Sequence, residues 1–196
     1  MGRAAGGNPN RRAGGDPSAH HNRLAALAKE SAGITRELAT HHGQLATEAI
    51  AMQETKKRVF FKTILNSALN AMCALSGITM SQAMSYRHTR NLAKMLIREG
   101  LSVAAAVGYN YGENAKAICM RYLDEGGDHL PSMWNDLQEG RPTEIEYING
   151  KIVKIGHMFK NVDVDANLFF TSLVITQEIK SGVRQPDDIP DYLQHF

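Results

Sequence analysis

Between residues 58 and 75 the apolar positions recur with the spacing of one face of an α-helix. They fall at i, i+1, i+4, i+8 and i+11, which are Ile64, Leu65, Ala68, Met72 and Leu75. Gly77 follows this stretch, and glycine is the usual residue just past the C-terminus of a helix. The pattern therefore predicts an amphipathic helix that packs on a core and ends at Gly77.

The chain beyond Gly77 predicts further helices. A long amphipathic helix ending near Gly108 is marked by Leu92, Met95, Leu96, Val103, Ala106 and Val107. Shorter helices are expected over 114–123, from Pro131 and Ser132 to the break at Gly140 and Pro142, over 145–155 and over 166–180. Thr79 or Ser81 is expected to cap the helix that follows Gly77. Because no segment reads as a β-strand and no repeat is present, the predicted fold class is all-α.

The first part of the chain has a different composition. Residues 1–20 are rich in Gly, Pro, Asn and Arg, so burial cannot offset their ordering entropy and a disordered basic tail is predicted. Residues 21–57 are helix-forming, although Gly33 and Gly43 are expected to interrupt the helix. The leucines of this segment are irregularly spaced, at Leu24, Leu27, Leu38 and Leu45. The predicted organisation is a tail at 1–20, a helical lead-in segment at 21–57, a helical domain at 58–181 and a polar C-terminal tail at 182–196.

Charge and composition exclude some classes of partner. The 196 residues include 22 basic and 20 acidic ones, and this near balance argues against nucleic acid as the main partner. No apolar run approaches the roughly 18 residues that span a bilayer, and the first thirty residues contain no signal-peptide core. Cys73 and Cys119 lie in apolar helical stretches and are predicted to be buried free thiols rather than a disulfide. We therefore expect a cytoplasmic protein that does not bind membranes.

Histidine pairs occur twice in the first part of the chain, at His20-His21 and at His41-His42. Neighbouring residues on a helix point about 100° apart, and no cysteine or carboxylate stands at i+4 to complete a ligand set. We interpret both pairs as solvated side chains, and no metal site is predicted.

A stripe of polar residues lies opposite the apolar face of the helix at 58–75. Lys62, Asn66 and Asn70 are spaced at i, i+4 and i+8, so they share one side of the helix with a drift of about 40° per step. A solvent-facing surface is the simpler explanation, and spacing alone favours it. Two neutral amides beside one lysine also suit a polar pocket, because solvent faces of helices usually carry more charge.

A second group comprises Ser132, Asp136 and Glu144. Ser132 and Asp136 share a helix face, and the break at Gly140 allows Glu144 to lie beside it. A helix N-cap at Ser132 and a favourable first-turn acid at Asp136 would explain those two residues without a ligand. That explanation does not account for Glu144.

These two groups, together with the segment 143–150, resemble the C-terminal domain of ketopantoate reductases (2-dehydropantoate 2-reductases) in order and internal spacing. The resemblance covers about residues 58 to 180 and implies the helical C-terminal domain of the 6-phosphogluconate-dehydrogenase-like fold. Glu99 matches a glutamate that recurs in the long helix of the family. The resemblance implies NADP-dependent reduction of a 2-keto acid, ketopantoate, to pantoate in pantothenate biosynthesis.

The same resemblance implies a role for each matched residue. Lys62 would stabilise the developing alkoxide and donate a proton, and Glu144 would position this lysine and reach the cofactor side of the cleft. The remaining matched residues would bind substrate or support the site: Asn66, Asn70 and Ser132 for binding, Asp136 and Glu99 for support.

The sequence also departs from the family pattern. The glycines at 2–7 and 14–15 follow no strand, so no Rossmann dinucleotide-binding domain is predicted and NADP would need a separate nucleotide-binding domain. The turn at 164–167 keeps Asn167 but lacks the proline common in the family. We expect no reductase activity from the chain alone, whether it is a fragment, a split protein or a mis-called start. The alternatives left open are a related 2-keto or 3-hydroxy acid dehydrogenase domain and a non-catalytic helical module that dimerises through the exposed cleft face.

Overall fold

The computed structural model describes residues 17–194, and every regular element in this range is a helix, as the sequence predicts. The expected tail at 1–20 lies outside the described residues except for 17–20, which belong to the first helix, α1 (Pro17–Ser76). The chain divides into two compact units, one up to Gln53 and one from Glu54 onward. The two units are therefore described separately.

The first unit is the N-terminal half of α1. Side chains from Ala25 to Gln53 are exposed without exception. The prediction that Gly33 and Gly43 interrupt the helix is wrong, because α1 is continuous through both. Neither glycine has a neighbour within 4 Å of the position that a Cβ would take, so each costs helix propensity but creates no steric break.

The second unit is a helical domain that includes the C-terminal half of α1. The predicted apolar face is confirmed, with Ile64, Leu65, Ala68 and Met72 buried. Burial also extends around the helix to Phe60, Leu69, Ala71, Cys73 and Ala74. The helix ends at Ser76, and Gly77 takes a φ of +69° as the glycine after a helix commonly does.

Helix α1 is apolar enough to be compared with a membrane span, and its burial explains why. Within the described residues, Ala25–Ser76 has a window of 18 residues with a mean hydropathy of 1.2, which meets the length and hydropathy of a membrane span. Burial within the protein covers 61% of that window. An apolar helix that is mostly buried in its own domain is typical of a core helix, so the window is weak evidence for a membrane span.

Three short helices and one long one follow α1. Thr79 caps α2 (Met80–Ser85) through a complete capping box with Gln82, as predicted for that residue. The long amphipathic helix is α3 (Arg87–Ala106), and α4 (Ala115–Asp124) follows it. After a loop, α5 (Ser132–Gln138) begins directly behind Pro131.

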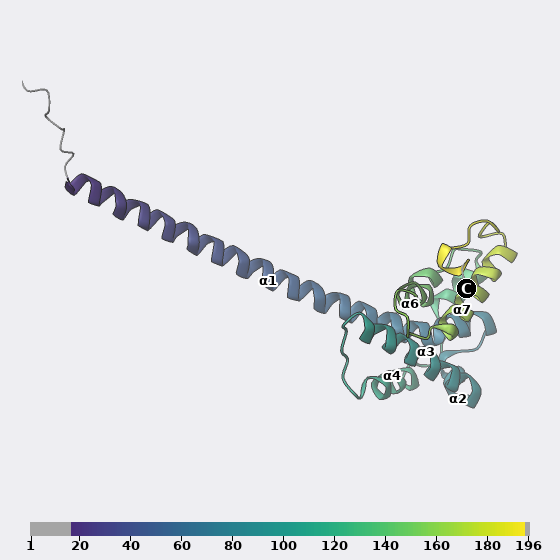
Figure 1. Ribbon diagram of the computed structural model, residues 1–196. Coiled ribbons are helices and arrows are strands. Elements are labelled where there is room, and N and C mark those ends of the chain that lie inside the picture. The colour runs from purple at the N-terminus through teal and green to yellow at the C-terminus, as the bar shows by residue number, and fades with distance from the viewer. Residues whose placement is uncertain (1–16, 195–196) are drawn as a thin grey trace, which may run out of the picture. The chain divides into compact units, whose positions relative to one another are not determined.

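The C-terminal part of the domain contains η1 (Ile145–Tyr147), α6 (Asn149–Gly156), α7 (Asp165–Lys180) and η2 (Asp191–Leu193). In Figure 1, α6 and α7 lie together on one side of α3, and α2 and α4 lie together on the other, which agrees with the contacts between these pairs. Helix α3 is therefore the central element of this unit.

Residues 182–194 pack on the domain, although the sequence reads as a polar tail. The Arg184 guanidinium donates from Nε to Glu178 Oε2 at 2.8 Å and from Nη2 to Glu146 Oε1 at 2.7 Å. Tyr192 and Leu193 also pack against the core. Ion pairs to two different elements and this apolar contact hold the segment in place.

Both cysteines are free and buried, as predicted. Burial raises the pKa of the Cys73 thiol to about 12 and that of Cys119 to about 11. Both thiols are therefore inert packing residues at neutral pH.

Candidate functional site

The polar stripe of α1 changes from exposed to buried along its length. Lys62 is exposed, Asn66 is half-buried and Asn70 is only 6% exposed. Ser67, which flanks the stripe, is fully buried and donates its hydroxyl to Ile64 O at 2.9 Å. The stripe is therefore not an ordinary solvent face, since its C-terminal end enters the domain.

Asn66 and Asn70 line one hollow of about 440 Å³. Its other walls come from three elements, with Met80 from α2, Tyr122 from α4, and Glu125 and His129 from the loop before α5. The walls alternate amide, carboxylate, imidazole and apolar groups. A concave site of this size and mixed polarity suits a small polar organic molecule.

The loop that forms one wall is held to α2 by its backbone. Met80 N donates to His129 O at 3.0 Å, and Ser81 N donates to Gly127 O at 3.1 Å. These bonds satisfy N–H groups at the start of α2 that have no partner within the helix. They also fix the position of His129 at the rim of the hollow. Sequence reasoning did not identify His129; its place three residues before Ser132 was the available signal.

Lys62 lies one helical turn, about 6 Å, before Asn66 along α1. It does not line the hollow, and its ammonium group has no polar partner among residues 17–194. The structure thus brings Asn66 and Asn70 together and leaves Lys62 exposed beside them.

In the second predicted group, Ser132 and Glu144 are exposed and Asp136 is half-buried. Ser132 is exposed and is the first residue of α5, where Pro131 takes the N-cap position without a side-chain bond, so the N-cap interpretation of Ser132 is wrong. Asp136 pairs with Arg141 at 2.8 Å. Glu144 is exposed before η1, and its carbonyl oxygen accepts from Tyr147 N at 2.9 Å. Neither Ser132 nor Glu144 lines the hollow that contains the two asparagines.

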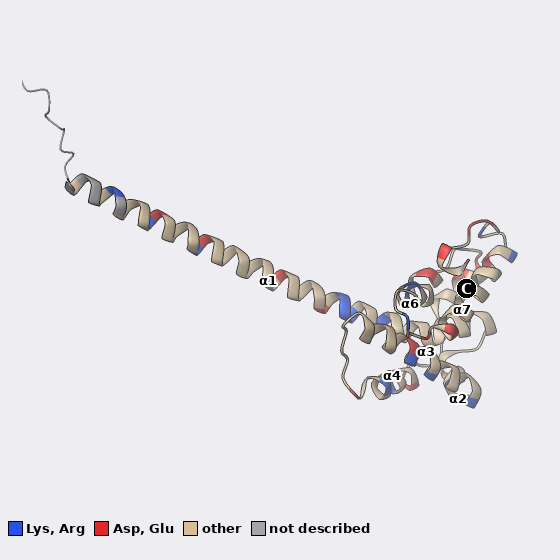
Figure 2. Cartoon of the chain, in the orientation of Figure 1, with Lys and Arg blue, Asp and Glu red and all other residues tan. Residues whose placement is uncertain are grey.

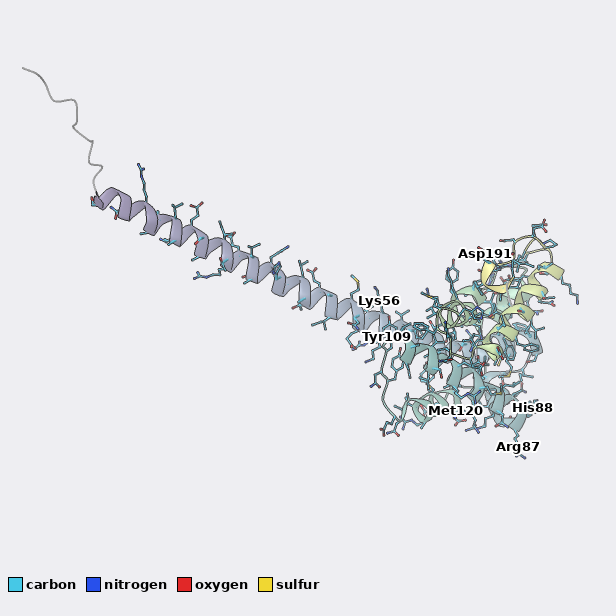
Figure 3. The ribbon with its side chains drawn as sticks, in the orientation of Figure 1. Lys56, Arg87, His88, Tyr109, Met120 and Asp191 are labelled. Carbon is cyan, nitrogen blue, oxygen red and sulfur yellow. The ribbon has the colours of Figure 1, made fainter. Side chains whose placement is uncertain are left out.

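A second groove lies on the domain beside the stripe. It has a volume of about 600 Å³ and its walls are mainly apolar. It is lined by Lys56 and Thr63 of α1, Tyr109 from the loop after α3, and Tyr147 just after Glu144. Figure 3 shows Lys56 and Tyr109 close together at this groove. Tyr147 is 78% exposed, so this groove presents an uncovered aromatic surface.

Glu99 belongs to α3, and its buried carboxylate lies at the N-terminus of α7. Its oxygens accept from Ala166 N at 2.9 Å, Asn167 N at 2.9 Å and Asn167 Nδ2 at 2.7 Å. Desolvation raises the pKa of this carboxyl, although the three hydrogen bonds oppose the shift. Glu99 therefore joins two helices of the domain and does not face the hollow.

The described residues do not fit a dinucleotide site. A Rossmann site needs a strand, a glycine-rich turn and a helix, and residues 17–194 contain no strand. Among the same residues, no group of three His, Cys, Asp or Glu side chains could hold a metal ion. His41 and His42 are exposed, whereas the side chains of His20 and His21 lie outside the described part.

The chain is similar to curated 2-dehydropantoate 2-reductases. The protein from Archaeoglobus fulgidus is 28% identical over 135 residues, covering 69% of this chain and 44% of the relative. The Aquifex aeolicus protein is 30% identical over 132 residues, covering 65% and 42%. This chain thus spans less than half the length of these relatives.

Solved structures of ketopantoate reductases and of a related dehydrogenase are also similar to this chain. The PanE/ApbA family ketopantoate reductase from Ralstonia eutropha JMP134 has a TM-score of 0.58 at 27% identity, covering 63% of this chain and 41% of that one. D-mandelate dehydrogenase, solved with NADH and anilino(oxo)acetate, has the same TM-score and identity, covering 65% and 42%. Residues 54–178, more than half of the chain, match the family described as ketopantoate reductase PanE/ApbA C terminal. The chain therefore belongs to the ketopantoate reductase family and carries its helical C-terminal domain, of the 6-phosphogluconate-dehydrogenase-like fold.

Proposed function

We propose that this chain supplies the substrate-binding and proton-donating half of a 2-keto acid reductase of the ketopantoate type. The observation that carries the proposal is the position of Asn66 and Asn70 in one hollow, with Lys62 one turn away on the same helix. Family membership supports the reaction class. The substrate is ketopantoate and the product is pantoate, as in pantothenate biosynthesis.

The three residues of the stripe have complementary tasks. The amides of Asn66 and Asn70 each offer donors and an acceptor, which suits the carbonyl and hydroxyl groups of ketopantoate. Reduction of a ketone develops negative charge on its oxygen. The Lys62 ammonium stabilises that charge and then donates the proton that completes the alcohol. Its exposed position allows the long side chain to reach the rim of the hollow.

Ser132 and Glu144 contribute from the exposed surface nearby. Ser132, which follows the loop that carries His129, binds the carboxylate of the substrate. Glu144 precedes Tyr147 at the apolar groove and acts on the cofactor side, where it positions the lysine. Asp136 and Glu99 support the helices that carry these groups.

The hydride donor comes from a separate nucleotide-binding domain that binds NADP. The lack of a strand in residues 17–194, and hence of a dinucleotide site there, supports this part of the proposal. The apolar groove around Tyr109 and Tyr147 is where that domain docks, because it is open, aromatic and adjacent to Glu144. A hydride donor must come within about 3–3.5 Å of the carbonyl carbon, so the chain alone is inactive. The buried free thiols agree with a cytoplasmic protein.

A related dehydrogenase that acts on another 2-keto acid is the second candidate. The similarity to D-mandelate dehydrogenase equals that to the Ralstonia eutropha ketopantoate reductase in TM-score and identity. The hollow also includes Tyr122 and Leu69, which can contact a larger apolar substituent. A non-catalytic helical module is the third candidate, favoured by the exposure of Lys62 and Glu144 outside the hollow.

The test is a chimera in which the nucleotide-binding domain of a family member is fused to residues 54–196. We expect NADPH oxidation that depends on ketopantoate, and a loss of about 10²–10⁴-fold in kcat in Lys62→Ala. Lys154→Ala, an exposed lysine of α6, is the matched control and keeps full turnover. Faster turnover of aromatic 2-keto acids would favour the second candidate. A folded chimera that binds NADPH but reduces no keto acid would leave only the non-catalytic module.

A further inference from the structure

The exposed half of α1 carries a stripe of large apolar side chains with a heptad repeat. Leu27, Ile34, Leu38, Leu45 and Met52 are each between 49% and 60% exposed. Their steps along the chain are 7, 4, 7 and 7 residues. Leucine positions alone look irregular, but with Ile34 and Met52 included the stripe fits the a and d positions of a coiled coil. We call these five residues the heptad stripe.

Two features indicate that this half of α1 has a partner. Every side chain from residue 25 to 53 is exposed, so no packing within the described residues stabilises the helix. Gly33 and Gly43 lower its intrinsic helix propensity by about 1 kcal/mol each. Helices in water owe most of their stability to packing of an apolar face, and a seven-residue apolar period is the signature of packing against another helix.

Polar residues at the remaining a and d positions discriminate between a parallel and an antiparallel pair of helices. Ser31 occupies an a position, and His41 and Glu48 occupy d positions. In a parallel, in-register pair, Glu48 would face Glu48 and His41 would face His41 of the second helix. Buried like charges oppose association, so the parallel arrangement is disfavoured.

An antiparallel pair of two copies resolves this conflict. We propose that residues 27–52 form an antiparallel two-helix coiled coil with the same segment of a second copy of this chain. In the register that covers the whole stripe, Leu27 packs on Met52 of the other copy and Ile34 packs on Leu45. Ser31 meets Glu48 and Leu38 meets His41, so both carboxylates face hydroxyl groups instead of each other.

The flanking positions agree with this register. Glu37 lies beside Gln44 of the second copy, and Thr35 lies beside His42, so no like charges meet. Both glycines fall outside the a and d positions, where they do not weaken the seam. Figure 2 shows charged residues of both signs spaced sparsely along this half of α1, with no block of one sign to repel a second copy.

This interaction surface lies outside the residues that match the family, 54–178. The proposal therefore does not rest on the proposed function, and each can fail without the other. Its consequence is a homodimer joined through residues 27–52, whatever contacts the helical domain makes.

Cysteine cross-linking of the full chain tests the register. Ile34→Cys with Leu45→Cys in one chain should give a covalent dimer under mild oxidation. The two positions are 11 residues apart on one helix, about 16 Å, so they cannot bond within a chain. Ile34→Cys alone should not cross-link. Cross-linking of that single variant would indicate a parallel pair and would overturn the proposal.

Sedimentation of the full chain tests the stripe itself. Leu38→Asp with Leu45→Asp should weaken self-association at least tenfold without loss of the folded domain, checked by cooperative thermal unfolding. Ile50→Ser is the matched control, because Ile50 is exposed to 64% but lies off the stripe. Equal weakening by both variants, or a wild-type monomer that instead binds anionic lipid vesicles, would refute pairing through the stripe.

Discussion

Glu99 of α3 accepts two hydrogen bonds from Asn167 of α7, one from the backbone at 2.9 Å and one from the side chain at 2.7 Å. The carboxylate is 2% exposed, and Asn167 is fully buried. Asn167 Oδ1 in turn accepts from Asn149 Nδ2 of α6 at 3.1 Å. One buried polar chain thus links the three helices α3, α7 and α6, and carboxylate charge at the N-terminus of α7 favours that helix.

Replacement of Glu99 should destabilise the domain because its donors would remain buried. We expect Glu99→Ala to lower the free energy of unfolding by about 2–4 kcal/mol, through several unsatisfied groups. Urea unfolding followed by circular dichroism measures this loss. Glu113→Ala, at an exposed position, is the control and should change stability by less than about 0.5 kcal/mol. Equal losses in the two variants would contradict the assigned role of Glu99.

The raised pKa of Glu99 predicts how this contribution depends on pH. Because the pKa is higher in the folded than in the unfolded protein, the folded state binds the proton more tightly. Its contribution is therefore fully present below the ordinary glutamate pKa and declines as the pH rises through the raised value. The stability of the wild type relative to Glu99→Gln should fall from acidic toward neutral pH in urea titrations. A difference that grows over that range would show that the pKa is lowered instead.

Arg184 should be the most sensitive residue of the C-terminal segment. Its side chain is 11% exposed and pairs with Glu178, whose side chain is 1% exposed. Arg184→Ala leaves that carboxylate with only Thr143 as a donor, and a loss of about 3–5 kcal/mol is expected from an unpaired buried charge. Arg141→Ala removes an ion pair of a half-exposed side chain and should cost less than about 1 kcal/mol. Thermal unfolding of both variants provides the comparison.

Two glycines of the helices should respond in opposite ways to alanine. A Cβ on Gly100 of α3 would lie 2.9 Å from Ile64 Cγ1, so Gly100→Ala should destabilise the domain by about 1–3 kcal/mol. Gly43 has open space around it, so Gly43→Ala should increase helix content through a propensity gain of about 1 kcal/mol. Circular dichroism at 222 nm during thermal unfolding measures both effects. A stabilised Gly100→Ala variant would contradict the close approach of α1 and α3.

Burial should protect both thiols from reagents. With the pKa of Cys73 near 12 and that of Cys119 near 11, neither forms appreciable thiolate at pH 8. We expect no labelling by a thiol reagent in the folded protein and two labelled thiols per chain in denaturant. Rapid labelling of the folded protein at either position would show that the surrounding core opens easily.

The helical elements follow directly from local sequence. Periodic apolar residues between 58 and 75, the capping residue Thr79 and the glycine at 77 are near-neighbour signals, and they correctly predict the end of α1 and the start of α2. The same approach failed at Gly33 and Gly43. A single glycine lowers helix propensity by only about 1 kcal/mol, which good helix formers on both sides can outweigh.

For the candidate site, too, local sequence determines one part and the tertiary structure the other. The spacing of Lys62, Asn66 and Asn70 on one helix face is a local property, so the sequence by itself determines that they share a side, and the motif identifies the family. Only the tertiary structure decides that the two asparagines enter a hollow and the lysine stays exposed. Met80, Tyr122 and His129 complete that hollow from 10 to 59 residues beyond Asn70, and no local pattern links them to it.

The C-terminal segment and Glu99 complete the contrast. Residues 182–194 are polar, and their composition therefore predicts a tail. Composition contains no information on the ion pairs that Arg184 forms with Glu178 and Glu146, which lie in other elements. The resemblance assigns Glu99 only a supporting role, and its partners are known only once α7 places its N-terminus over the carboxylate. Periodicity and capping determined the helices, whereas desolvation and pairing of charges across the fold decided which polar residues stabilise it, since both depend on three-dimensional neighbours.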